Sequence, residues 1–285
     1  METPFPPFDP EGRGYAGARL RDIPLKTIFP NLITLLAIAS GLTSIRFAAE
    51  QRLELAIAAI VVAAFLDGID GRVARLLKST TRFGAQMDSL ADFVNFGVAP
   101  ALLLYFALLD QLRSFGWIAA LIFAICACLR LARFNVMLDD PNRPKWQRDF
   151  FTGVPAPAGA LTALAPLYVL LLGMGPHDSF AALSAAYVVG VGLLMVSSLP
   201  TFSGKEMGSR VPRNFVLPFL ILIVVFVAAV FSYPWHMLLG CSLLYLLSLP
   251  FGYRDWVRKS QADKRSRQVE RAVAEESATS SSPED

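Results

Sequence analysis

Four aspartates on either side of a short basic stretch are the residues of this sequence best suited to chemistry. Asp67 and Asp70 are three residues apart, and Asp88 and Asp92 are four residues apart, so each pair shares one face of a helix. Carboxylates are costly at membrane depth and tend to mark a functional site there. Their oxygens are ligands that Mg²⁺ and Mn²⁺ prefer. The pattern therefore predicts a site in which two divalent ions hold a phosphate group.

The residues between the aspartates fit the same site. Gly71 and Ala74 lie one turn beyond the first pair and keep the helix thin, so that a nucleotide can approach the backbone. Arg75 suits a phosphate oxygen, Thr81 offers a hydroxyl group, and Gly84 marks the start of the next helix. Taken singly, Gly71 or Gly84 would more often be a packing glycine, and any one of the aspartates could be a helix cap or a solvated loop residue. Their combination at a membrane boundary favours a nucleotide-diphosphate site.

The composition indicates an all-α integral membrane protein. Hydrophobic residues make up 54% of the 285 residues and charged residues 17%, a balance typical of membrane proteins. Apolar segments predict a polytopic bundle of about eight transmembrane helices, with six as the alternative because the last two segments are joined by a tight turn. The segments cover about 30–48, 53–70, 90–109, 116–134, 155–174, 180–199, 215–232 and 235–251.

The positive charges predict the orientation of this bundle. With eight spans, 23 of the 26 Lys and Arg residues fall on the side that holds both termini and the aspartates. By the positive-inside rule both termini and the candidate site face the cytoplasm. We expect a cytoplasmic tail at 1–27, a transmembrane domain at 28–253 and a disordered cytoplasmic tail at 254–285, which is polar and charged.

The length of the second segment places the site below the membrane surface. The segment has only 14 residues, from Leu53 to Leu66, before Asp67, and a helix of that length spans about 21 Å, less than the roughly 30 Å of a hydrocarbon core. The helix must therefore continue past Asp67 and Asp70. Both carboxylates are predicted to lie in a polar cavity that opens to the cytosol.

The complete pattern resembles the signature of a known family. Asp-x2-Asp-Gly-x2-Ala-Arg-x8-Gly-x3-Asp-x3-Asp, from Asp67 to Asp92, is similar to the signature of the CDP-alcohol phosphotransferases. The resemblance implies a homodimeric membrane enzyme with a six-helix core, which transfers a phosphatidyl group from CDP-diacylglycerol to an alcohol and releases CMP. It implies that Asp67, Asp70 and Asp88 hold one Mg²⁺ or Mn²⁺ ion, that Asp67, Asp88 and Asp92 hold the second, and that Asp92 is the general base.

The resemblance also implies contacts to the nucleotide and a location. Gly71, Arg75 and Thr81 match the family's contacts to the diphosphate, and Ala74 and Gly84 occupy further signature positions. The first-helix segment with Asn31 and Thr34 resembles the family's CDP-binding strip, although Asn31 can alternatively cap that helix. The cytoplasmic membrane of a bacterium is the expected location, with membrane lipids as neighbours and no nucleic acid as partner.

The flanking sequence favours L-serine as the acceptor. The segments 88–100, 130–135 and 151–157 are similar to the integral-membrane phosphatidylserine synthases of this family. Ser89 and Phe93 stand where relatives that use glycerol phosphate carry proline and lysine, whereas Asn95 departs from the serine branch. Serine carries a carboxylate, which an arginine fork binds well. Arg130 or Arg133 can supply that fork, or both can be anchors that reach the lipid head groups.

Other functions remain open from the sequence. The same chemistry can use glycerol 3-phosphate, inositol phosphate or choline, and only the acceptor separates these enzymes. A cation transporter would also place carboxylates in the membrane. Transport explains neither Gly71 nor Arg75, and the aspartates cluster at one membrane face. An inactive scaffold is disfavoured because no signature position is missing.

Overall fold

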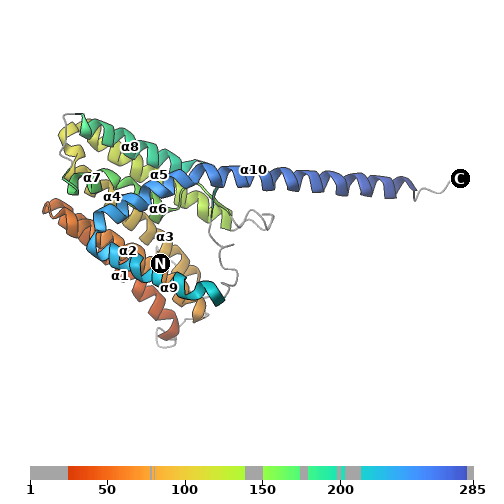
Figure 1. The fold of residues 1–285 in the computed structure, drawn as a ribbon, viewed down its shortest axis with the longest axis horizontal. Helices are drawn as coiled ribbons and strands as arrows, with labels where there is room; N and C mark the ends of the chain where they lie inside the picture. The colour runs from red at the N-terminus through yellow and green to blue at the C-terminus, as the bar shows by residue number, and fades with distance from the viewer. Residues whose placement is uncertain are drawn as a thin grey trace, which may run out of the picture.

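The chain folds into a bundle of helices with one short β ribbon (Figure 1). Most of the predicted N-terminal tail lies outside the described residues. A computed structural model of the chain describes residues 25–77, 79, 81–138, 150–173, 179–197, 200–202 and 213–280.

Each of the eight predicted apolar segments is helical. The third segment is a composite of α3, the π-helical turn η2 and α4, and the fifth is divided into α6 and α7. The elements are α1 (Leu25–Ala49), α2 (Leu53–Leu76), α3 (Arg82–Phe93), η2 (Val94–Val98), α4 (Ala99–Ala107), the 3-10 turn η3 (Leu109–Leu112), α5 (Ser114–Leu138), α6 (Ala156–Ala163), α7 (Ala165–Leu171), α8 (Phe180–Val196), α9 (Arg213–Ser232) and α10 (Pro234–Ser280).

Four helical stretches of the described chain are long and apolar enough to cross a membrane. Three shorter apolar helices accompany them, namely α6–α7, α8 and most of α9. The helix α2 is also long, but its C-terminal half carries the charged residues from Asp67 to Arg75. The helical membrane class is thus confirmed, whereas the number of spans stays a prediction. The four stretches are Ile28–Ala49, Phe83–Ala107, Ser114–Met137 and Pro234–Arg258.

The helices α1 and α2 form an antiparallel pair, joined by a tight turn in which Gln51 has a φ of 59°. Small residues line their contact and allow close approach, as is usual between membrane helices. Ser40 donates a hydrogen bond of 2.7 Å to the carbonyl of Ala59, and Ser44 donates one of 2.8 Å to the carbonyl of Ala56. This pairing fixes α2, and with it Asp67 and Asp70, relative to α1.

A π-helical turn follows directly after the second pair of aspartates. The turn η2 contains Asn95, which is fully buried, and Gly97. A Cβ atom on Gly97 would lie 3.1 Å from the Cβ of Ala127 on α5, so the glycine allows close packing there. Turns of this kind are frequent at functional sites. Because η2 adds a residue to the turn, it sets how α4 is rotated relative to the aspartates on α3.

The helices that follow α4 form the rest of the packed core of the bundle. The largest fully buried side chains include Phe123 of α5 and Tyr168 of α7, and Tyr168 donates a hydrogen bond of 2.9 Å to the carbonyl of Leu161. The break between α6 and α7 falls just before Pro166, whose ring lacks the N–H of a continuous helix. The strands β1 (Phe150–Thr152) and β2 (Pro200–Phe202) pair antiparallel beyond α5 and α8.

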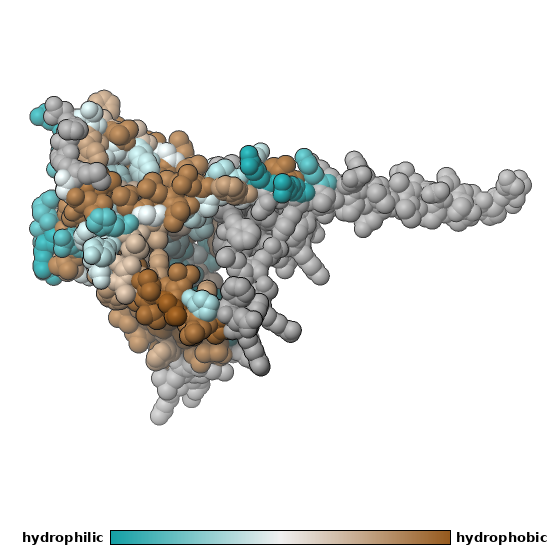
Figure 2. Space-filling view, viewed as in Figure 1, coloured by the Kyte–Doolittle hydropathy of each residue, from teal (hydrophilic) through white to brown (hydrophobic). Residues whose placement is uncertain are grey.

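The C-terminal helix differs from its prediction. The sequence predicted a disordered tail from residue 254, whereas α10 continues as one helix to Ser280. The segment beyond Tyr253 is rich in Arg, Lys, Gln, Glu and Ala, which are good helix formers even where they bury no apolar surface. In Figure 2 apolar side chains cover much of the bundle, and a hydrophilic patch lies where α10 leaves it.

Candidate active site

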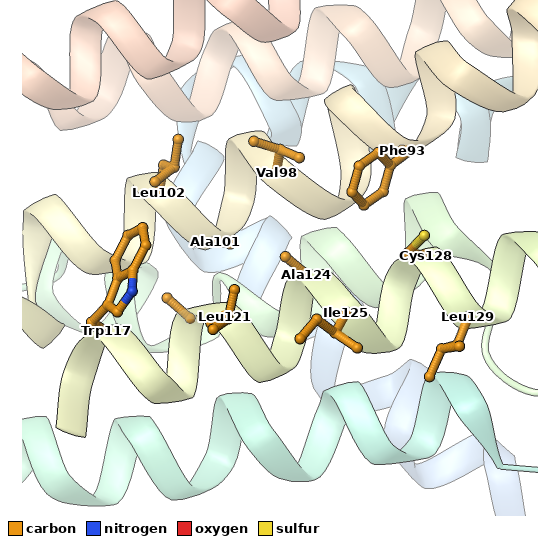
Figure 3. Close-up of a pocket in the computed structure, with 11 residues that line it drawn as sticks. Phe93, Val98, Ala101, Leu102, Trp117, Leu121, Ala124, Ile125, Cys128 and Leu129 are labelled. Carbon is orange, nitrogen blue, oxygen red and sulfur yellow. The ribbon is translucent and has the colours of Figure 1, made fainter. Parts of the chain in front are cut away.

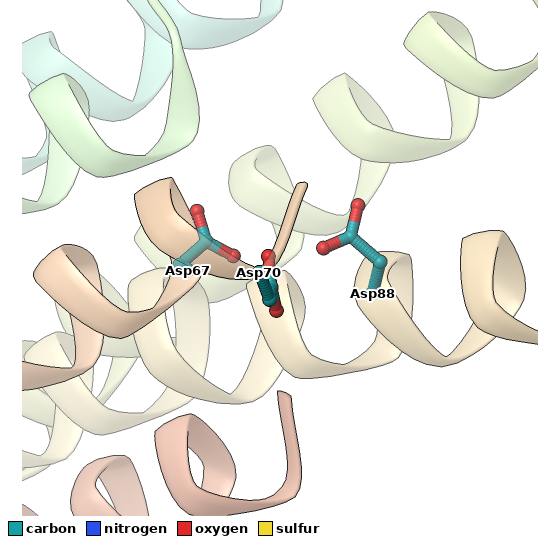
Figure 4. Close-up of side chains that lie close together, drawn as sticks. All are labelled: Asp67, Asp70 and Asp88. Carbon is teal, nitrogen blue, oxygen red and sulfur yellow. The ribbon is translucent and has the colours of Figure 1, made fainter. Parts of the chain in front are cut away.

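The last turns of α2 and the middle of α3 bring three carboxylates together. Oxygen atoms of Asp67, Asp70 and Asp88 all lie within 4.8 Å of one another. Figure 4 shows Asp67 and Asp88 pointing toward each other with Asp70 between them. Carboxylates at this spacing repel one another strongly unless a cation or a proton compensates them. All three donors are oxygens, so the cluster fits a hard divalent cation.

Asp70 is the most firmly held member of this cluster. Its side chain is only 3% exposed, and its Oδ2 accepts a hydrogen bond of 2.7 Å from the Thr34 hydroxyl. The other oxygen, Oδ1, is buried and has no hydrogen-bond partner in the described part of the chain. A buried acceptor without a partner is costly. A cation bound between the carboxylates would satisfy it.

Asp92 lies beside this cluster, one turn further along α3. Its carboxyl group lies within hydrogen-bonding reach of Asp67 and also faces Asp88. Its Oδ1 is buried and lacks a partner among the described residues. Four carboxylates therefore converge from two helices, as their spacing predicted. Asp92 is the second-last residue of α3, just before η2.

Three of the predicted nucleotide residues meet at the start of α3. Thr81 caps this helix by accepting a hydrogen bond of 3.0 Å from the backbone N–H of Gly84. A Cβ atom on Gly84 would lie 3.2 Å from both Asn31 Oδ1 and Thr81 Oγ1. Asn31 of α1 thus lies against the first turn of α3, on the same side of α1 as Thr34. The structure does not use Asn31 as the cap of α1, because α1 begins at Leu25.

Thr34, also predicted to contact the nucleotide, bonds to Asp70 instead, and the other three candidates lie on the last two turns of α2. A Cβ atom on Gly71 would meet nothing within 4 Å, so the space beside this glycine is open. Arg75 is exposed, and its Nε donates a hydrogen bond of 3.0 Å to the carbonyl of Gly71. Ala74 is half-buried. Open space at Gly71, next to an exposed arginine, leaves room for a diphosphate.

The two candidate arginines of α5 point to different places. Arg130 is 7% exposed, lies over the ring of Phe134 at 5.5 Å, and is attracted by the charge of Asp92. Its Nε has no hydrogen-bond partner among the described residues. Arg133 is exposed and donates a hydrogen bond of 3.0 Å to the carbonyl of Val196 at the end of α8. Only Arg130 is buried beside the aspartates.

Two features of the site were not assigned from the sequence. Asn135 of α5 donates a hydrogen bond of 3.1 Å to Ser89, which follows Asp88 directly, and so ties the middle of α3 to α5. Asn95 of η2 lies against Gly41 of α1, where an added Cβ would overlap the amide oxygen. Both asparagines lie in segments whose sequences resemble phosphatidylserine synthases, 88–100 and 130–135. The sequence alone did not reveal which helix each would face.

Comparison with known proteins places the chain in a family. The family model "CDP-alcohol phosphatidyltransferase" matches residues 27–199, and the model "CDP-alcohol phosphatidyltransferase 2" matches residues 214–250. The chain belongs to the CDP-alcohol phosphatidyltransferase family. The first match contains the whole signature from Asp67 to Asp92.

Individual relatives share most of the chain. It is 44% identical over 230 residues to a CDP-diacylglycerol–serine O-phosphatidyltransferase of Mycobacterium leprae, covering 80% of this chain and 75% of the relative. It is 36% identical over 236 residues to a protein of the same name from Helicobacter pylori, covering 81% and 91%. It is also 36% identical over 176 residues to an archaetidylserine synthase of Methanothermobacter thermautotrophicus, covering 60% and 67%.

Proposed function

We propose that this protein transfers the phosphatidyl group of CDP-diacylglycerol to the hydroxyl group of L-serine, giving phosphatidylserine and CMP. The observation that carries the proposal is the convergence of four carboxylates from α2 and α3 within one complete family signature. The names of the relatives support serine as the acceptor.

The donor set fits two Mg²⁺ or Mn²⁺ ions. Asp67, Asp70 and Asp88 would hold one ion, and Asp67, Asp88 and Asp92 the other. When bound, such ions neutralise the charge on the diphosphate and stabilise the developing charge at phosphorus. Thr34 holds Asp70 in place by its hydrogen bond, as outer-shell partners of metal ligands commonly do.

The surrounding residues would position the nucleotide part of the donor. Gly71 and Ala74 leave room for it beside α2, and Arg75 would pair with a phosphate oxygen. Asn31, Thr81 and Gly84 line the start of α3, where backbone N–H groups and the helix dipole favour a negative charge. The diacylglycerol part remains in the membrane.

Arg130 and Asp92 would act on the acceptor. The guanidinium of Arg130 would bind the serine carboxylate, with Arg133 as the second candidate for this contact. Asp92 would accept the proton of the serine hydroxyl, whose oxygen attacks the phosphorus that bears the diacylglycerol group. A new P–O bond to serine forms while the P–O bond to CMP breaks, so CMP leaves without a covalent enzyme intermediate. Positioning and charge neutralisation would supply most of the rate enhancement.

The membrane arrangement is part of the same proposal. The distribution of Lys and Arg supports eight spans around a six-helix core, with both termini and the site facing the cytoplasm. The family suggests a homodimer in a bacterial cytoplasmic membrane. The proposed catalytic domain covers residues 28–253, between terminal segments 1–27 and 254–285.

One experiment tests the reaction and its acceptor. The purified protein in detergent is given CDP-diacylglycerol, a divalent cation and each candidate alcohol in turn, and the release of CMP is measured. We expect release with L-serine alone, and loss of release with EDTA. Release with glycerol 3-phosphate, inositol phosphate or choline would instead change the acceptor and keep the mechanism. Folded protein that releases no CMP with any alcohol would contradict the proposal.

A further inference from the structure

The buried arginine of α5 faces the interior of the bundle. Side chains on the outward face of α5, among them Ile125 and Leu129, line an apolar groove with α4 (Figure 3). Arg130 instead lies on the face of α5 that packs into the bundle, together with Leu131. Its guanidinium lies over the ring of Phe134, and its Nε has no hydrogen-bond partner among the described residues. A buried cation is costly unless acceptors or anions pair with it, so this guanidinium is suited to an anionic ligand.

The helix α10 crosses the bundle beside α6 and α7 and runs in the opposite direction (Figure 1). Leu239 of α10 lines a cavity of about 310 Å³ with Val169 of α7. Three residues further along α10, the hydroxyl of Ser242 lies 3.4 Å from the carbonyl oxygen of Leu161 on α6. The residues of α10 after Ser242 therefore approach the start of α6. Because α6 contacts both α3 and η2, this part of α10 lies toward the candidate active site.

Tyr245 is the next inward side chain of α10 after Ser242. The two residues are three positions apart and share one face of the helix, whereas Leu244 and Leu247 are exposed on another face. Tyr245 packs against the hydrophobic core, and its hydroxyl oxygen is buried. This hydroxyl also lies within electrostatic range of the Arg130 guanidinium. The helix α10 thus brings a phenol group to the same interior region as Arg130.

We propose that Tyr245 and Arg130 together bind the carboxylate of the acceptor, with the Tyr245 hydroxyl donating a hydrogen bond to it. The inference rests on the proposed function, which assigns the serine carboxylate to Arg130. A carboxylate accepts about four hydrogen bonds, and a guanidinium fork fills two of these positions. The phenol fills a further position that would otherwise stay unsatisfied in a buried site, at a cost in affinity. Alcohols without a carboxylate gain nothing from this pair, so α10 contributes to the choice of acceptor.

Tyr245→Phe removes only the hydroxyl group and is tested in the full-length enzyme in detergent. The release of CMP is measured at varied serine and at varied CDP-diacylglycerol concentrations. We expect the KM for serine to rise about tenfold, the effect of losing one hydrogen bond to a charged group. The kcat and the KM for CDP-diacylglycerol should stay close to their original values, because the lost contact is to the acceptor alone. Tyr253→Phe, at an exposed tyrosine further along α10, is the matched control and should change neither KM.

A double variant tests whether the two side chains bind the same group. If Tyr245 and Arg130 share the acceptor carboxylate, their substitutions are coupled. We expect Tyr245→Phe to raise the KM for serine much less in the Arg130→Lys background than in the parent enzyme. Independent, multiplicative effects of the two substitutions would contradict a shared ligand.

Two further results would overturn the assignment of Tyr245. An unchanged KM for serine in Tyr245→Phe, when the parent enzyme releases CMP with serine, would exclude the hydroxyl from the acceptor site. Equal increases in both KM values with a lower Tm would indicate that the hydroxyl only stabilises the packing of α10. Failure of the proposed function is recognised separately, because the parent enzyme would then release CMP with a different alcohol or with none.

Discussion

Thr34 of α1 donates a hydrogen bond of 2.7 Å to Asp70 of α2, 36 positions along the chain. The same hydroxyl lies 3.2 Å from the carbonyl of Pro30, so α1 itself fixes its orientation. Asp70 Oδ2 is thereby occupied, whereas Oδ1 is buried and has no hydrogen-bond partner among the described residues. The first helix, which carries no acidic residue of its own, thus orients a proposed metal ligand on the second.

Replacing Thr34 by valine keeps the side-chain shape and removes this hydrogen bond. We expect the affinity for Mn²⁺ to fall about 10- to 100-fold, the usual effect of losing an outer-shell partner of a metal ligand. Calorimetric titration with Mn²⁺ measures the change. Thr43→Val is the matched control, because Thr43 lies on the same helix and donates its hydrogen bond to the carbonyl of Ala39 within α1. Equal affinities of the two variants would contradict an orienting role for Thr34.

Divalent cations should also stabilise the fold. The carboxylates of Asp67, Asp70 and Asp88 repel one another without a counter-charge, and a ligand at 100 times its Kd stabilises a protein by about 2.7 kcal/mol. We therefore expect Mg²⁺ or Mn²⁺ to raise Tm in a thermal unfolding assay in detergent, and EDTA to lower it again. Asp88→Asn should reduce this shift. Asp110→Asn, an exposed aspartate in η3, should not.

The sequence predicted the elements well where one local signal was decisive. Long apolar segments predicted the helices, and the short apolar part of α2 predicted that the helix continues past Asp67. The spacing of the signature predicted that Asp67, Asp70 and Asp88 meet. In each case the residues that determine the feature lie within a few turns of one helix, or in two helices joined by a short loop.

Features that depend on distant packing were not predictable. Within the turn η2, Gly97 packs closely against Ala127 on α5, a contact that no local pattern reveals. Arg130 and Arg133 are three residues apart on α5, and the sequence offers either of them as the fork for the acceptor carboxylate. They diverge because the end of α8 offers Arg133 a carbonyl acceptor, whereas Arg130 is buried beside Asp92. Long side chains on one face of a helix can still find different partners.

Alanine variants of Gly68 and Gly71 in α2 can distinguish an effect on helix stability from an effect on nucleotide binding. Added Cβ atoms at Gly68 and Gly71 would meet nothing within 4 Å, so alanine fits at both positions and should stabilise the helix by about 1 kcal/mol. We expect Gly71→Ala alone to weaken binding of CDP-diacylglycerol, because its methyl group would occupy space proposed for the diphosphate. Thermal unfolding and a CDP binding assay measure the two effects. Similar binding by both variants would argue against a nucleotide beside Gly71.

Arg130 should determine the affinity for the acceptor. Arg130→Lys keeps the charge but loses the planar fork, and a hydrogen bond to a charged group contributes about 1.5–3 kcal/mol. We therefore expect the KM for serine to rise roughly 10- to 100-fold while the KM for CDP-diacylglycerol stays close to its original value. Steady-state CMP release measures both constants, and Arg46→Lys, an exposed arginine paired with Glu50, is the control. Equal increases in both KM values would indicate a structural role.

Asp92 has two proposed roles, as a ligand of the second cation and as the general base, and one variant can distinguish them. Asp92→Asn keeps the side-chain shape but cannot take a proton, and the loss of a general base lowers the rate by about 10²- to 10⁴-fold. We expect such a fall in kcat with CDP-diacylglycerol binding retained, and Asp110→Asn serves as the control. If Asp92 acted only as a cation ligand, high Mn²⁺ concentrations should restore the activity of Asp92→Asn. Persistence of the defect at saturating Mn²⁺ would therefore assign proton transfer to Asp92, whereas full rescue would assign it to another group.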